Sequence, residues 1–284
     1  MIDCIRAYHL LLGKVEPHRV AGAMQELIIS EEQLSQFIGQ YLWPLLRISA
    51  FYFAVPVIGA RTVPARVRII LTLFTAIIIV PVLPPAPVVS FLSAQGFMMV
   101  VQEVLIGLAL GFAMQVVLHV FVLAGQFMAM KMGLGFAAMN DPSSGVSVTI
   151  LSQFYLLLST LLFLSSNGHL VVLQLMIDSF TTFPIGGAGM NSAHFMTIVD
   201  MGSWLFSAGL LITLPLFTSL LIVNMSFGVM SRSAPQMNVF TVGFPITLIF
   251  GFILMWFTFA NFLPVYFEIM EEGIGVLRTL ALTP

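Results

Sequence analysis

A series of polar and small residues recurs every four positions through an otherwise apolar part of the sequence: Glu103, Gly107, Gly111, Gln115 and His119. Residues four apart lie near one face of an α-helix, so the series predicts a slowly winding stripe on one long helix. An acid and an imidazole at membrane depth are typical of an ion pathway. Two glycines four apart are instead typical of close helix packing, with one satisfied buried acid. We favour packing against partner helices over ion conduction.

A second candidate site is the segment MGLGFAAMNDPSSG at 132–145, which separates two apolar stretches. Its glycines and its Asp-Pro and Ser-Ser-Gly sequences favour turns, so no helix is expected to continue through it. Met132, Phe136 and Met139 give the segment an apolar side. It is either a connecting loop or a movable gate, because irregular backbone at membrane depth is tolerated where protein buries it or where it lines a water-filled cavity.

Sequence patterns of catalysis are missing. There is no HExxH, no GxSxG and no pair of carboxylates on one helix face, and GGAG at 186–189 lacks the strand and the GK[ST] ending of a phosphate loop. The single cysteine, Cys4, excludes an internal disulfide and a cysteine metal cluster. The sequence therefore predicts no enzyme, cofactor or metal site.

The composition indicates an all-α membrane protein. Of the 284 residues 59% are apolar and 8% are charged, whereas soluble domains carry about 25% charged residues. Lipid or apolar protein must therefore cover most of the surface. The net charge of −2 without a basic patch argues against a nucleic-acid partner.

The apolar stretches are unequal in length. They run at about 37–59, 67–83, 97–130, 146–165, 169–183, 201–231 and 239–267. As one helix, 97–130 would be about 50 Å long, against about 30 Å of hydrocarbon in a bilayer. We expect such helices to tilt, to break, or to extend beyond the bilayer on other protein. Unequal lengths suit one subunit of a larger assembly.

Prolines and polar breaks divide these stretches. Prolines within or beside the helices, at which kinks or ends are expected, are Pro44, Pro56, Pro215 and Pro245. Loops or breaks are predicted at PVLPPAP (81–87), Asn167-Gly168-His169 and FPIGGAG (183–189). Asp178 and Lys131 are read as interfacial charges.

The chain divides into a polar lead at 1–30 and a helical membrane domain at 31–284. The lead is either disordered or the product of a mis-called start, with Met24 as the true first residue. Arg61, Arg66 and Arg68 predict a cytoplasmic loop by the positive-inside rule.

Seven segments, taken in order, resemble the FliR family of membrane subunits of the flagellar type III export gate. Four are YLWPLLRISA at 41–50, VPARVRIILTL at 63–73, QEVLIGLALGFAMQ at 102–115 and AGQFMAMKMGLGFAAMNDP at 124–142. Three more are FLSSNGHL at 163–170, DSFTTFPIG at 178–186 and SAPQMNVFTVGFP at 233–245. The resemblance extends from Glu31 to Tyr266 and rests on the order and spacing of the segments.

The resemblance implies a non-enzymatic subunit of a conical helical assembly around an export path. One copy joins several FliP-like and FliQ-like membrane subunits, with an FlhB-like switch subunit, membrane lipid and the exported unfolded flagellar proteins as further partners. The assembly is raised toward the periplasmic side of the bacterial inner membrane, in the flagellar basal body. That position explains helices that do not fit a bilayer, and it weakens the topology inferred from the arginines.

The resemblance also implies a plug, a loop inside the channel that corresponds to about Met132 to Val148. Phe136 and Met139 supply its bulky apolar contacts, and its glycines supply mobility. The residues assigned to it are Met132, Gly133, Gly135, Phe136, Met139, Asp141, Pro142 and Gly145. Glu103 varies within the family, which argues against an obligatory ionic role.

Two other functions stay open at this point. The related subunit of an injectisome is one, although NGHL, FPIG and SAPQ look flagellar. A small-molecule or ion transporter is the other, but transporters often contain internal repeats and the sequence shows none.

Overall fold

The computed structural model describes residues 31–60, 62–87, 89, 93–134, 149–233 and 243–282, and within these ranges it contains helices and no strand. The helices are α3 (Glu31–Ala54), α4 (Ala65–Ile79), the 3₁₀ turn η1 (Val80–Val82), α5 (Ala94–Lys131), α7 (Ile150–Ser165), α8 (Gly168–Thr182), α9 (Ser192–Ser233), α10 (Phe244–Phe259) and α11 (Phe262–Leu282). The prediction of an all-α membrane protein with long, kinked and broken helices is confirmed.

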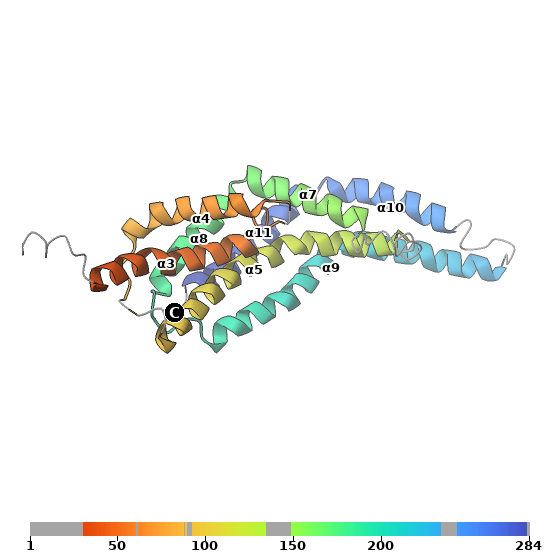
Figure 1. Ribbon diagram of the computed structural model, residues 1–284. Helices are drawn as coiled ribbons and strands as arrows, with labels where there is room; N and C mark the ends of the chain where they lie inside the picture. Colours follow the sequence, from red (N-terminus) through yellow and green to blue (C-terminus); the bar gives the residue numbers. More distant parts are fainter. Residues whose placement is uncertain are drawn as a thin grey trace, which may run out of the picture.

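Helix α5 is the centre of the described structure, with α3, α7, α9 and α11 packed against it (Figure 1). It has 38 residues, which makes it about 57 Å long. It is apolar on nearly all sides, as expected of a helix surrounded by protein. Helix α5 is continuous over its 38 residues, so it does not break to fit the thickness of a bilayer.

Three helices are long and apolar enough to cross a membrane, and two bent pairs bring the count to as many as five within the described ranges. Helices α7 and α8 meet at 71°, at the predicted polar break, where Asn167 has a φ of 58°. Helices α10 and α11 meet at 68°. This second bend lies inside the apolar stretch 239–267, so α11 begins within that stretch and continues past it to Leu282.

Two of the four prolines lie at helix ends, and the other two lie inside helices that continue past them. Pro56 follows the end of α3, Pro44 lies within α3, and Pro245 lies in the first turn of α10, where its missing N–H has no partner to lose. Helix α9 has 42 residues and continues past Pro215 to Ser233. The predicted loop at 81–87 begins with the 3₁₀ turn η1.

An aromatic cluster joins α5, α7 and α11 next to the second bend. The ring of Phe121 lies 5.8 Å from that of Phe262 and 5.4 Å from that of Tyr266, and Tyr155 lies 5.5 Å from Phe262. All four side chains are buried. Tilted and edge-on aromatic pairs at such separations are favourable, so the cluster fixes where α11 turns back along α5.

Candidate functional site

The carboxylate of Glu103 is paired with Arg47, a residue to which the sequence analysis gave no role. Arg47 Nε lies 2.7 Å from Glu103 Oε2, and Nη2 lies 3.0 Å from Oε1. Both side chains are buried. This bidentate geometry is the strongest that a guanidinium and a carboxylate can adopt.

Arg47 also holds α8. It donates to the backbone oxygens of Ser179 (3.0 Å) and Phe183 (2.8 Å) and to the Ser179 hydroxyl (3.3 Å). Its guanidinium carbon lies 4.1 Å from the centre of the Phe180 ring. The five hydrogen bonds match the five donors of a guanidinium, so one side chain connects α3, α5 and the end of α8.

The backbones of α3 and α5 approach closely at the two glycines of the stripe. A Cβ on Gly107 would collide with the backbone oxygen of Arg47, and one on Gly111 would lie 2.9 Å from the oxygen of Phe51. Gly107 lies one turn and Gly111 two turns after Glu103. The close backbone approach and the ion pair therefore belong to the same interface between α3 and α5.

We expect Gly107→Ala to weaken the contact between α3 and α5. The added methyl meets backbone, which cannot rotate away, so overpacking of about 1–3 kcal/mol is expected. Thermal unfolding of the detergent-solubilised chain measures it. Gly202→Ala on α9 is the matched control, because a Cβ there meets nothing within 4 Å. Equal midpoints for the two variants would contradict the close approach.

The stripe does not stay on one face. Glu103, Gly107 and Gly111 are buried, whereas Gln115 and His119 are exposed, and the His119 ring contacts the Gln115 backbone oxygen at 2.7 Å. Each step of four residues advances by about 40° more than a full turn, so the stripe rotates by about 160° over its length. Within this chain, Glu103 and His119 therefore do not form one pathway.

The C-terminal end of α5 is capped by backbone hydrogen bonds. The Leu134 N–H donates to the Ala129 oxygen (2.9 Å) and the Gly133 N–H to the Met130 oxygen (3.2 Å), with Gly133 at a φ of 82°. This Schellman arrangement needs a residue that tolerates positive φ. Gly133 therefore has a fixed role in ending the helix, different from the mobility that the resemblance implied for it.

Met132 lies in the core and anchors the same end. Its side chain is fully buried and packs against α10, where a Cβ on Gly251 would lie 2.6 Å from Met132 Cγ. Lys131 places its ammonium 3.9 Å from the centre of the Phe217 ring of α9, a cation–π contact that ties it to protein.

The start of α7 is fixed to the same end of α5. Thr149 caps α7, and Gln126 Oε1 accepts from the Thr149 hydroxyl (3.2 Å) and the Ser152 hydroxyl (3.0 Å). A Cβ on Gly125 would lie 2.7 Å from Ser152 Cα. Gln126 is six residues before Met132, which is about 9 Å along the helix. Leu134 and Thr149, the described residues on either side of 135–148, are therefore both held near the C-terminal end of α5.

Six of the residues assigned to the plug lie outside the described residues. They are Gly135, Phe136, Met139, Asp141, Pro142 and Gly145. The plug thus stays a prediction. The structure describes the helix ends on either side of the segment.

Arg68 has a local structural role. Its guanidinium donates to the backbone oxygens of Ile58 (3.1 Å), Ala60 (2.6 Å) and Val63 (3.2 Å), which closes the turn between α3 and α4. Arg66 is exposed in the first turn of α4, and Arg61 lies outside the described residues.

The statement that no helix face carries two carboxylates is wrong. Glu268 and Glu272 are one turn apart on α11, and both line a groove between α9 and α11. The apolar stretch was taken to end at 267, so the helix that carries them was not recognised. Among the described residues, no group of three or more metal-ligating side chains is found.

The comparison with known proteins identifies the family. The sequence profile of "Bacterial export proteins, family 1" matches residues 38–273. The chain belongs to this family. The flagellar biosynthetic protein FliR of Escherichia coli (strain K12) is 40% identical over 231 residues, which cover 81% of this chain and 87% of that protein.

More distant relatives carry the same name. FliR of Pectobacterium carotovorum subsp. carotovorum is 36% identical over 79% of this chain and 86% of its own length. FliR of Bacillus subtilis (strain 168) is 28% identical over 84% of this chain and 93% of its own length. This export-family chain is therefore a flagellar export-gate subunit and an inner-membrane transport component. Its division at residue 30 stays a prediction.

Proposed function

We propose that this chain lines the path by which unfolded flagellar proteins cross the inner membrane, and that residues 132–148 plug that path. It carries out no catalysis of its own. It assembles with FliP-like and FliQ-like membrane subunits and an FlhB-like switch subunit, raised toward the periplasmic side. The exposed apolar faces of α4 and α9 support the assembly, because protein or lipid must cover them.

The observation that carries the plug is the pair of attachments at the end of α5. A Schellman cap and a buried methionine hold one end, and a capped α7 bound to Gln126 holds the other. The 14 residues between them can reach at most about 24 Å out and back. A loop with fixed, neighbouring ends can move in a channel without disturbing the helices that carry it.

The experiment for the assembly is native mass spectrometry of the tagged chain, co-expressed with its FliP-like and FliQ-like neighbours and extracted in mild detergent. We expect a complex several times the 31.1 kDa of the chain, with both smaller proteins in excess. A stable monomer or homodimer would contradict the proposal and favour a transporter.

A further inference from the structure

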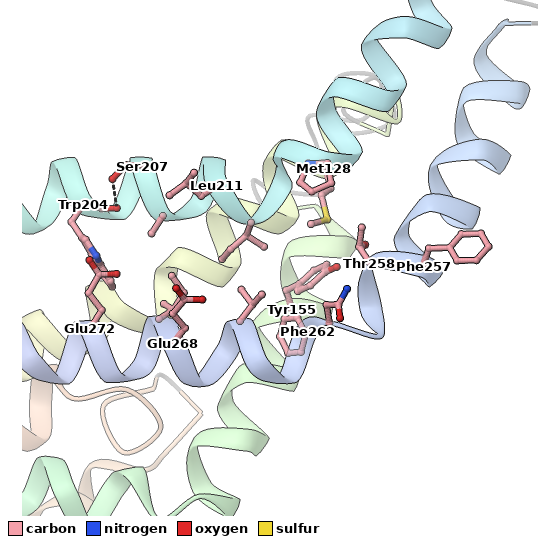
Figure 2. Close-up of a pocket in the computed structure, with 16 residues that line it drawn as sticks. Met128, Tyr155, Trp204, Ser207, Leu211, Phe257, Thr258, Phe262, Glu268 and Glu272 are labelled. Carbon is pink, nitrogen blue, oxygen red and sulfur yellow. Dashed lines mark hydrogen bonds between the residues drawn. The ribbon is translucent and has the colours of Figure 1, made fainter.

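A groove of about 490 Å³ lies between α9 and α11 and ends at the bend between α10 and α11 (Figure 2). Its walls are mostly apolar, with Leu211 and Ile212 from α9 and Val265 and Ile269 from α11. Leu211 and Phe257 at its edge have 66% and 70% of their surface exposed. The groove does not include Arg47 or Glu103, and its lining residue Met128 of α5 lies between Gln126 and Met132, where the plug loop is attached.

Two carboxylates face this apolar groove. Glu268 and Glu272 both line it from α11, and both are exposed. Among the described residues, Arg47 and Glu103 form a salt bridge, and no cation is paired with either groove carboxylate. Like charges one turn apart on a helix repel each other. A positive charge in the groove would therefore reduce the repulsion between the two carboxylates.

The acidic part of the groove also contains an aromatic ring. Figure 2 shows Trp204 of α9 beside Glu272 of α11. The indole Nε1 of Trp204 is buried and has no hydrogen-bond partner. This N–H is a donor, so an acceptor of a bound group, such as a carbonyl oxygen, would satisfy it.

The size of the groove argues against a bare ion. About 490 Å³ falls within the roughly 300–1,000 Å³ of sites that take organic groups. A metal ion would leave the apolar walls uncovered. A lysine or arginine side chain on an apolar helix meets both requirements, since its stem covers apolar surface and its head carries the charge.

We propose that the groove between α9 and α11 docks an apolar helix of another subunit of the export gate, with a Lys or Arg side chain between Glu268 and Glu272. The proposal rests on the proposed assembly and names the chemistry of one of its contacts. The charge on this chain is negative and the walls are apolar, so the occupant must be apolar and locally cationic.

The first test replaces both carboxylates with amides of the same size. E268Q/E272Q is expected to lower the recovery of the partner subunit with the tagged chain at least about tenfold, because the partner's cation would be left unpaired. E271Q is the matched control, because Glu271 is exposed on the same helix but does not line the groove. Unchanged recovery for E268Q/E272Q would overturn the docking site.

The second test leaves both carboxylates in place, so it does not depend on the folding of a charge variant. A photo-reactive amino acid is placed at Leu211 in the groove and, as control, at Ile222, which is similarly exposed on α9 but outside the groove. From Leu211 we expect a cross-linked peptide from an apolar segment of a partner that contains Lys or Arg. A phosphatidylethanolamine adduct, a peptide of a second copy, or a peptide without a cation would overturn the proposal.

The proposed assembly and the proposed docking site can be disproved separately. If the unmodified chain forms no complex with its neighbours, the proposed assembly fails and the docking site fails with it. If the complex forms and survives E268Q/E272Q as well as E271Q, only the docking site fails.

Discussion

Replacing Arg47 by Met is expected to abolish flagellar motility and to lower the amount of assembled gate sharply. Arg47 connects α3, α5 and α8, and its loss leaves the Glu103 carboxylate buried without a counter-charge. Breaking a buried ion pair from one side typically costs about 3–5 kcal/mol. Swimming in soft agar and the amount of chain in the membrane measure the effect. Arg66→Met, at an exposed arginine of α4, is the control.

The double variant Arg47→Met, Glu103→Leu separates packing from ion conduction. Removing both charges leaves no unpaired ion, so the double variant is expected to recover part of the assembly and motility that each single change loses. Recovery is partial, because the backbone oxygens of Ser179 and Phe183 lose their donor. A double variant as inactive as the worse single variant would indicate that the ionisable groups themselves are needed.

Replacing residues 135–145 by a Gly-Ser linker of equal length is expected to make the inner membrane leak small ions while export continues in part. The change keeps the Gly133 cap and Thr149, so the helices that hold the loop stay in place. Hydrophobic constrictions close a pore by excluding water, and the linker lacks the apolar side chains that would do so. Passive ion flux in cells and the amount of secreted filament protein are the measurements.

The control for the linker variant is Ser143→Ala, Ser144→Ala, which alters the same segment without removing a bulky apolar side chain. Its ion flux should equal that of the unmodified chain. Flux at the unmodified level in the linker variant would mean that this segment does not seal the path.

Local signals in the sequence predicted the helical elements well. The polar break at Asn167 marks the bend between α7 and α8, and the apolar stretch 97–130 lies within α5. A glycine shortly after Lys131 is the ordinary sequence sign of a helix end, although the resemblance implied mobility for Gly133 instead. The position of the bend at Ala260 was missed, although Asn261 and Pro264 lie beside it within the stretch.

Contacts between residues far apart in the chain could not be predicted from a single sequence. Arg47 and Glu103 are 56 residues apart, and only the fold brings them together. Glu103 was predicted to be a satisfied buried acid, but nothing in the spacing identified Arg47 as its partner. Glu268 and Glu272 were missed for a different reason, since they lie in the part of α11 that extends beyond the apolar stretch 239–267.

The measurement that tests the account most directly is photo-cross-linking from position 136 to a flagellar protein stalled during export. A photo-reactive amino acid replaces Phe136, and the substrate carries a folded domain that cannot pass the gate. The account predicts an adduct between the two that appears only while the substrate is stalled. Absence of the adduct, in cells where the stalled substrate is shown to block export, would contradict the claim that this chain lines the export path with its plug loop.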